Sequence, residues 1–410
     1  MASQDIIPNL FRTEYGKIVA VLTKSFGLEH MEQAEDIASE TFLQAMDTWP
    51  YKGIPKNPAA WLYTVAKNKA INQLKRDAVF RNKITEALRV QGGPGDAMEL
   101  VLTEEHIADS QLQMLFAICH PSLRPEAQIS LALRVLCGFG IDEIATALLC
   151  RKETINKRLQ RARAKLKAGH IQLNVPSIRE LKVRLDIVLR TIYLLFSEGY
   201  YSESRDTVVR KELCLEAMNL IYLLLQNAQT ATHDTCSLMA LMCFHSSRLD
   251  ARQSEEGDMI LYRDQDESLW DTSLVEKGFL YLQQASKWEI ASKYYLEASI
   301  AYWHTIKEDS LEKWESILKL YDLLLTFEKT PAALMNRIFA LYKTGQKETA
   351  LREAQKLNLE GNQYYYLLLG ELYAGLNTEK ARKSLALALE NCCSETERKV
   401  IRKQMQVLGL

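Results

Sequence analysis

Apolar residues recur at helical spacing along nearly the whole chain. They stand three or four positions apart, and no segment shows a sustained alternation of β-branched residues. Glycine and proline, which interrupt helices, number only 17 and 9 among 410 residues. The pattern predicts an all-α protein, and a chain of this length predicts several helical domains.

Two interruptions of the helical pattern predict domain boundaries. Residues 91–96 (Gln-Gly-Gly-Pro-Gly-Asp) cannot continue a helix, and acidic residues follow them. A basic helix is expected to stop at Gly169, shortly before Pro176. We therefore expect a first helical module (5–84), an acidic linker (85–111), a second helical module (112–170), a helical extension (177–290) and degenerate helical repeats (291–410).

The last segment shows a weak internal repeat. Residues 336–345 followed by Ala350, and residues 366–375 followed by Ala381, resemble the small and aromatic positions of a tetratricopeptide helix pair. An irregular helical bundle is the alternative, because Gly, Ala and Tyr are common wherever helices cross closely.

Charge is segregated along the chain although the formal net charge is only -1. Residues 51–83 hold eight Lys and Arg against Asp77 alone, and residues 151–170 hold eight against Glu153 alone. Residues 1–50 are acidic. Two compact basic segments, each with a balance of +7, therefore stand out, and this segregation matters more for the choice of partner than the total charge.

Residues 31–49 predict an amphipathic helix. Its core-facing stripe is expected to hold Ile37, Ala38, Thr41, Phe42, Ala45, Met46 and Trp49. Another face carries Asp36, Glu40, Leu43 and Asp47. That face suits docking on a basic protein surface, and its alternative is a solvated helix face.

Residues 57–76 predict a second helix, capped by Asn57 with Pro58 at its first position. Leu62, Val65, Ala66, Ala70 and Leu74 are expected to face the core. The opposite stripe mixes an aromatic side chain, amides and cations, which stack on unpaired bases, bond base edges and neutralise phosphates. Its members are Trp61, Thr64, Asn68, Asn72, Lys75 and Arg76.

These two blocks, in this order, resemble regions 2.1 to 2.4 of extracytoplasmic-function (ECF) RNA polymerase sigma factors. The resemblance implies polymerase docking at Asp36, Glu40 and Leu43, and contact with the minus-10 promoter element at Trp61, Asn68, Asn72, Lys75 and Arg76. The loop 51–57 corresponds to the one that receives a flipped promoter base. The chain departs from the family at Ser39, where Gln is frequent, and at Asn72, where Asp is common.

Residues 140–166 have the form of a helix-turn-helix motif. Ile144, Ala145 and Leu148 are expected to pack on Ile155, Leu159, Ala162 and Leu166. The second helix then presents polar and basic residues outward, where early ones read major-groove edges and later ones hold phosphates. They are Arg151, Lys152, Thr154, Asn156, Lys157, Arg158 and Arg161.

This motif resembles region 4 of the same sigma factors, which reads the minus-35 element, although Leu149 and Cys150 replace the usual glycine of the turn. Residues 192–200, 210–217 and 261–271 are similar to the subgroup with a C-terminal tetratricopeptide-like domain. The resemblance implies core RNA polymerase and promoter DNA as partners, and control through the fused domain. Asp264, Gln265 and Asp266 are either a contact site or helix caps and a buried network around Trp270.

No catalytic site, metal or cofactor is predicted. The sequence has no glycine-rich phosphate loop, nucleophile elbow or HExxH motif. Cys243 and His245 would point to different sides of one helix, so His233, Cys236, Cys243 and His245 do not form a zinc set. The eight scattered cysteines, and the absence of a signal-peptide or membrane-helix pattern, indicate a cytoplasmic protein with reduced thiols.

The sequence thus predicts a sigma factor that binds core polymerase and directs promoter recognition, with a regulatory or interaction domain behind it and possible further protein partners. A tetratricopeptide scaffold, or a DNA-binding regulator, with vestigial sigma modules is the alternative. A transcription assay with core polymerase separates the two.

Overall fold

The computed structural model describes residues 3–88, 103–200, 207–252, 260–374, 376–392 and 395–407. Within these ranges every regular element is a helix, which confirms the all-α prediction. None of these helices is both long and apolar enough to cross a membrane. The chain divides into two compact units, residues 1–224 and 225–410.

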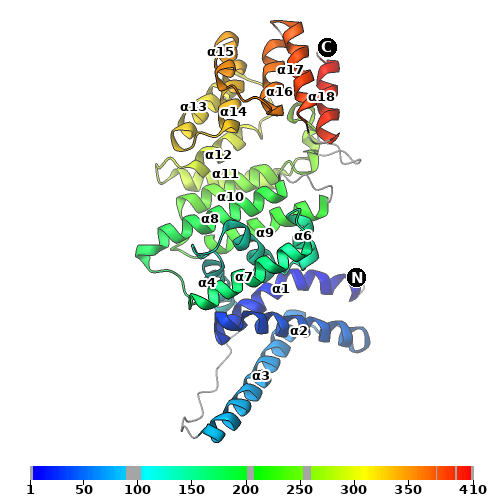
Figure 1. Ribbon diagram of the computed structural model, residues 1–410, viewed down its shortest axis with the longest axis vertical. Coiled ribbons are helices and arrows are strands. Elements are labelled where there is room, and N and C mark those ends of the chain that lie inside the picture. Colours follow the sequence, from blue (N-terminus) through cyan, green and yellow to red (C-terminus); the bar gives the residue numbers. More distant parts are fainter. Residues whose placement is uncertain are drawn as a thin grey trace. The chain divides into compact units, whose positions relative to one another are not determined.

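The first unit contains both predicted DNA-reading modules (Figure 1). Its elements are α1 (Ser3–Phe26), η1 (Leu28–His30), α2 (Met31–Lys52), α3 (Pro58–Leu88), α4 (Glu104–Ile118), α5 (Pro125–Leu131), η2 (Ala132–Leu136), α6 (Ile141–Ala147), α7 (Lys152–Ala168), α8 (Ile178–Tyr200) and α9 (Thr207–Leu225). Helix α1 packs on α2, α4 and η2. The linker residues 89–102 lie outside the described residues.

The start of α3 follows from the local sequence. The Asn57 side chain accepts a hydrogen bond from the backbone N–H of Ala60 at 3.0 Å, and Pro58 is the first residue of the helix. This confirms the predicted cap. Before α3, helix α2 is terminated by Gly53, the residue after Lys52. Gly53 has a φ of 81°, a backbone conformation that glycine adopts at little cost.

Helix α8 belongs to the first compact unit, because it packs on α4 and α5. Arg184 donates to the carbonyl oxygen of Phe116 at 2.6 Å, and the Thr191 hydroxyl bonds Gln128 Oε1 at 2.7 Å. The compact unit therefore continues past the boundary expected between residues 170 and 177, because the apolar face of α8 packs into the core of the second module.

The second unit is a succession of helices, most of which pack on the next helix along the chain. Its elements are α10 (His233–Ser246), η3 (Asp250–Arg252), η4 (Tyr262–Asp264), η5 (Glu267–Leu269), α11 (Thr272–Ser286), α12 (Lys293–Trp303), α13 (Leu311–Phe327), α14 (Pro331–Lys343), α15 (Lys347–Leu357), α16 (Gln363–Ala374), α17 (Thr378–Glu390) and α18 (Glu395–Val407). Three hydrophobic clusters follow one another along α12 to α18.

The predicted repeats fall on two helix pairs, α14 with α15 and α16 with α17. Ala350 and Ala381 are fully buried. Gly370 lets α16 and α17 cross closely, since a Cβ there would lie 2.6 Å from Leu385. The paired helices agree with the repeat, but their assignment to the tetratricopeptide class stays a prediction.

The polar run near Trp270 contains helix caps. Asp266 accepts from the backbone N–H of Ser268 at 2.9 Å, and Asp271 accepts from that of Leu274 at 3.1 Å. Gln265 is buried, and its backbone carbonyl accepts from Lys307. These contacts favour the structural interpretation of the run. In the described part of the chain, no three His, Cys, Asp or Glu side chains are grouped so as to hold a metal ion.

Candidate nucleic-acid interface

Helix α2 presents an acidic face to solvent. Asp36 and Glu40 are exposed, and Leu43 is 58% exposed. Their spacing of four and then three residues places them on one face. Glu40 is already paired, because its carboxylate lies 3.0 Å from Lys69 Nζ on α3.

Met46 adds a second apolar side chain to this region. The sequence pattern places it in the core-facing stripe, and that prediction is wrong, since the side chain is 55% exposed. The other members of the stripe, such as Phe42 and Trp49, are buried. Residues three apart are neighbours on a helix, so Met46 lies beside Leu43. Exposed apolar side chains among carboxylates favour a protein-contact surface.

The predicted minus-10 residues of α3 differ in how accessible they are. Asn68 and Asn72 are exposed. Trp61 is only half-exposed because its ring packs edge-on against Trp49, with 5.4 Å between the ring centroids. The side chains of Lys75 and Arg76 lie outside the described residues.

The segment before α3 carries an exposed aromatic ring. Tyr51 is 90% exposed and stands in the last turn of α2, at the start of the predicted base-binding loop. An exposed aromatic side chain next to basic residues suits stacking on an unpaired base. The sequence singled out the loop but not this ring.

The helix-turn-helix motif consists of α6 and α7, and its predicted core is confirmed except at Leu148, which is only half-buried. Ile144, Ile155, Leu159 and Leu166 are each at most 2% exposed. The turn keeps the left-handed backbone that glycine usually supplies, because Leu149 has a φ of 48°. An L-residue with a side chain adopts this conformation at a cost of about 1 kcal/mol.

Replacing Leu149 by glycine is expected to stabilise the motif. The side chain is 64% exposed, so little burial is lost, and glycine removes the steric cost of the turn. We expect the free energy of unfolding to rise by up to about 1 kcal/mol, which would raise the melting temperature by up to about 4 °C. The control variant is Thr146→Gly, on the exposed side of α6. It should instead lower the free energy of unfolding by about 1 kcal/mol. A lower melting temperature for Leu149→Gly would contradict the proposed strain.

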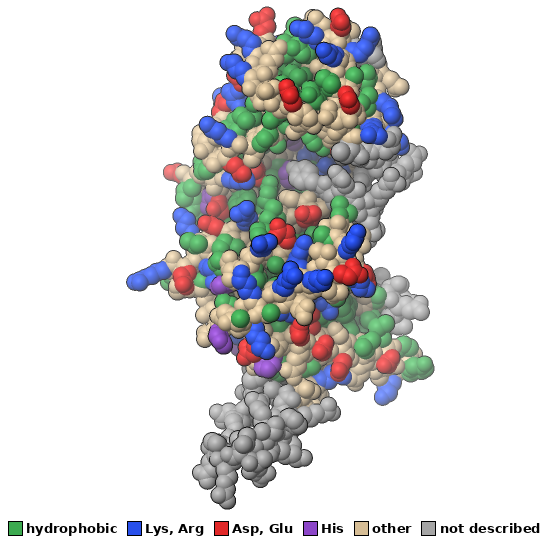
Figure 2. All heavy atoms as spheres, viewed as in Figure 1, with side chains coloured by type: hydrophobic (Ala, Val, Ile, Leu, Met, Phe, Trp, Pro, Cys, Tyr) green, Lys and Arg blue, Asp and Glu red, His purple; other side chains and the backbone are tan. Residues whose placement is uncertain are grey.

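Helix α7 exposes most of its predicted reading residues. Figure 2 shows Lys and Arg side chains gathered over α6 and α7 on the face in view. The exposed residues are Arg151, Lys152, Thr154, Asn156, Lys157 and Arg161. Lys152 pairs with Asp142 of α6 at 2.8 Å, and both side chains are well exposed, so water screens this pair and DNA can displace it.

Arg158 differs from its neighbours on α7. Its side chain is half-buried, and its guanidinium lies 3.3 Å from Ser130 Oγ and 3.9 Å from Cys150 Sγ. The helical pattern places Arg158 among the outward residues, but its long side chain turns back toward α5 and the turn. Arg158 therefore helps to hold the motif together and lies near the side of α7 that is predicted to face DNA.

The chain matches three protein families in sequence. Sigma-70 region 2 matches residues 10–79, and Sigma-70 region 4 matches residues 116–166. A family of unknown function, DUF6596, matches residues 184–286. The first two matches contain the exposed faces of α2, α3 and α7. No solved structure matches the chain.

Curated relatives agree with the two sigma matches. The ECF RNA polymerase sigma factor SigL of Mycobacterium tuberculosis is 30% identical over 131 residues, which cover 32% of this chain and 70% of SigL. The chain belongs to the ECF RNA polymerase sigma factor family. The sigma factor YlaC of Bacillus subtilis is 29% identical over 170 residues, covering 41% of this chain and 93% of YlaC.

This sigma factor also has a full-length relative. An uncharacterized protein of Rhizobium meliloti is 31% identical over 386 residues, covering 93% of this chain and 91% of the relative. The alignment includes the helical extension, so both chains share more than the two sigma regions. Membership of the family implies that this sigma factor is a transcription initiation factor that binds core RNA polymerase and promoter DNA.

Proposed function

We propose that this sigma factor directs core RNA polymerase to one class of promoters in the cytoplasm, using three separate helix faces. Asp36, Glu40, Leu43 and Met46 of α2 contact polymerase. The minus-10 element meets Tyr51, Asn68 and Asn72, with Trp61, Lys75 and Arg76 beside them, and the minus-35 element meets the exposed residues of α7. The observation that carries the proposal is that each matched sigma region exposes a polar or charged face of the expected chemistry.

Run-off transcription tests the whole proposal. Purified full-length protein is mixed with core polymerase and fragmented genomic DNA, and the transcripts are sequenced. Discrete start sites that depend on the added protein are expected, and they define the promoter. A scaffold with vestigial sigma modules would give no such transcripts.

Asp36→Arg is expected to weaken binding to core polymerase by about tenfold, because it reverses a charge on the proposed docking face. Asp36 is exposed, so the melting temperature should stay unchanged. Glu126→Arg, an equal charge change at an exposed position of α5, should bind normally. Affinity is measured with fluorescently labelled protein, and equal affinity of all three proteins would show that the α2 face is only solvated.

We further propose that the second compact unit, residues 225–410, controls the sigma modules through a partner or through polymerase. A stack of helix pairs buries a continuous core and leaves an extended face for binding. In addition, α8 and α9 of the DUF6596 match belong to the compact unit of the DNA-reading modules. The matched segment thus begins within one unit and ends in the other.

Ending the chain at Leu225 is expected to lower transcription from the cognate promoter, while binding to a minus-35 duplex is retained. This end point keeps α8, whose contacts with Phe116 and Gln128 support the second module. A chain that ends at Gly169 would lack that support. A loss of transcription could then reflect either poor folding of the second module or the loss of regulation. Thermal unfolding verifies that the shortened chain is folded, and equal activity of the two chains would leave the second unit without a regulatory role.

A further inference from the structure

The second compact unit buries two cations. Arg248, which follows α10, is 6% exposed, and Lys313 of α13 is 1% exposed. Among the residues that the structure describes, no carboxylate forms an ion pair with either side chain. Burying a charge is costly unless an opposite charge or a full set of hydrogen bonds compensates it. The two cations therefore call for an explanation.

Both cations contact Tyr262. The guanidinium carbon of Arg248 lies 5.4 Å from the centre of the Tyr262 ring and 5.8 Å from that of Trp270. The ammonium group of Lys313 donates to the Tyr262 hydroxyl at 3.0 Å and to the carbonyl oxygen of Ile306. We call Arg248, Tyr262, Trp270 and Lys313 the Tyr262 cluster. Because Tyr262 is only half-buried, the cluster lies close to the surface, where a small ion can reach it.

Two buried donors of the Tyr262 cluster have no acceptor in the described part of the chain. They are Nε of Arg248 and Nε1 of Trp270, whose side chain is 9% exposed. Next to them in the sequence, Oε1 of the buried Gln265 accepts no hydrogen bond. Buried polar groups nearly always have partners, because an unpaired one loses its hydration without compensation. A ligand with several acceptor oxygens and a hydroxyl group would supply these partners.

Two carboxylates lie near the cluster, and each is paired with another lysine. Asp309 accepts hydrogen bonds from Lys343 and from the indole of Trp314, and a Glu267 oxygen lies 3.8 Å from Nζ of Lys307. Burial lowers the pKa of Lys313, and Asp309 offsets this effect only in part. These two acids therefore leave an excess of positive charge in the cluster.

Two neighbouring histidines report the same positive field. Burial, together with the charges of Arg248 and Lys313, lowers the pKa of His304 to about 3. Burial and the charges of Arg248 and Arg252 hold the pKa of His245 well below its ordinary value. No carboxylate raises either pKa. Both imidazoles are therefore neutral near neutral pH, and the positive charge remains on the arginine and the lysine.

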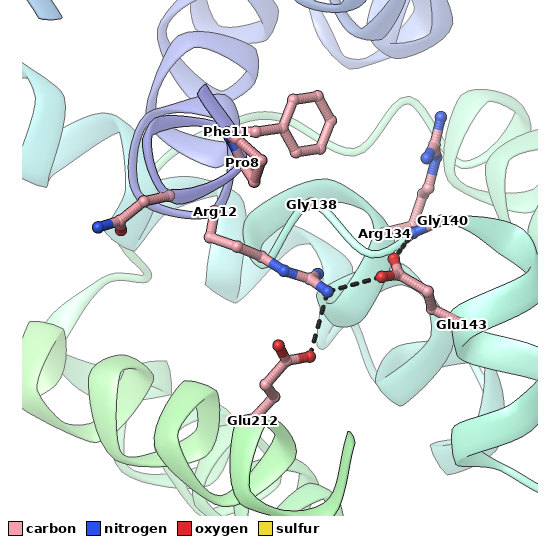
Figure 3. Close-up of a pocket in the computed structure, with 9 residues that line it drawn as sticks. Pro8, Phe11, Arg12, Arg134, Gly138, Gly140, Glu143 and Glu212 are labelled. Carbon is pink, nitrogen blue, oxygen red and sulfur yellow. Dashed lines mark hydrogen bonds and ion pairs between the residues drawn. The ribbon is translucent and has the colours of Figure 1, made fainter. Parts of the chain in front are cut away.

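Arg12 of the first unit shows the contrasting arrangement (Figure 3). It lines an open pocket of about 610 Å³ and pairs with Glu143 at 2.7 Å and with Glu212 at 3.2 Å. Two carboxylates already balance its charge, so an added anion would gain little there. Arg248 lacks such compensation, and this difference singles out the Tyr262 cluster as the anion site.

We propose that the second unit binds a small, doubly charged oxyanion at the Tyr262 cluster, either free phosphate or the phosphate group of a small molecule. Arg248 and Lys313 supply the positive charge, and Nε1 of Trp270 adds a neutral donor. A phosphate suits this set, because its oxygens accept several charge-assisted hydrogen bonds at once. The inference goes beyond the proposed function, since it concerns the second unit alone and its test requires no transcription.

Titration calorimetry of the full chain tests the site. The probes are inorganic phosphate, methyl phosphate and acetate, each added at an ionic strength held constant with sodium chloride. Phosphate should bind saturably, and acetate, with one charge, at least about tenfold more weakly. Binding of methyl phosphate would assign the site to a phosphate ester, and its exclusion would assign the site to the free ion. Equal affinity for acetate would contradict a site for a doubly charged anion.

Arg248→Met should lower the affinity for phosphate by at least about tenfold, because it removes a buried cation and keeps a side chain of similar length. In phosphate-free buffer its melting temperature should not fall, since an unpaired buried charge is lost. Trp270→Phe keeps a ring but removes the Nε1 donor, and it should weaken binding several-fold. It decides the question if Arg248→Met does not fold.

Arg352→Met is the matched control, because Arg352 is an exposed arginine of α15 in the same unit. It should bind phosphate with the affinity of the unmodified chain. The site is refuted if the folded unmodified chain shows no saturable phosphate binding. It is equally refuted if Arg248→Met and Trp270→Phe both bind phosphate as well as Arg352→Met does, since phosphate would then be held elsewhere.

Discussion

Lys157→Ala is expected to weaken binding to the minus-35 duplex by about 5- to 150-fold if Lys157 contacts a base, the equivalent of about 1–3 kcal/mol. The residue stands in the second turn of α7 and is exposed, and it forms no ion pair with any residue that the structure describes. If Lys157 contacts a phosphate instead, the loss of affinity is smaller and similar for all DNA sequences. The slope of log affinity against log salt concentration then becomes smaller by about one. Fluorescence anisotropy at several salt concentrations measures both.

Arg158→Ala is the informative companion. Because its guanidinium bonds Ser130 and lies near Cys150, its removal should lower the melting temperature, which Lys157→Ala should leave unchanged. Binding by Arg158→Ala is therefore compared at a temperature where both variants are folded. Full affinity of Lys157→Ala for promoter DNA would remove that residue from the reading surface.

Gly16→Ala is expected to destabilise the first compact unit by about 1–3 kcal/mol, although alanine is the better helix former. The added methyl group would stand 2.0 Å from the Leu136 carbonyl oxygen. Its nearest neighbours are all backbone atoms of Leu136, so no side chain can rotate away to make room for it. In a unit of this size the melting temperature should fall by about 2–4 °C for each kcal/mol.

Thr13→Ala is the matched control, since Thr13 is exposed one turn earlier on α1. It should change the free energy of unfolding by less than about 0.5 kcal/mol. Helix propensity alone predicts that Gly16→Ala raises the melting temperature. That result would contradict the close contact between α1 and η2.

The sequence alone was sufficient for the all-α class, the two sigma regions and the local helix signals. Helical periodicity and Asn57 with Pro58 act over a few residues, so α3 could be placed without knowing its neighbours. The buried positions of α7 were likewise predictable, because Ile155, Leu159 and Leu166 recur at the period of one helix face.

Tertiary structure decided which polar residues remain available. Periodicity gives the direction of a Cβ atom but not where a long side chain ends, so Arg158 turns inward, Trp61 leans on Trp49 and Glu40 is paired with Lys69. It also decided the exposure of Met46, and the contacts of α8 that extend the first unit past residue 177. The ion pair between Glu35 of α2 and Arg163 of α7 joins residues 128 positions apart, a pairing that local sequence pattern does not encode and that folding alone creates.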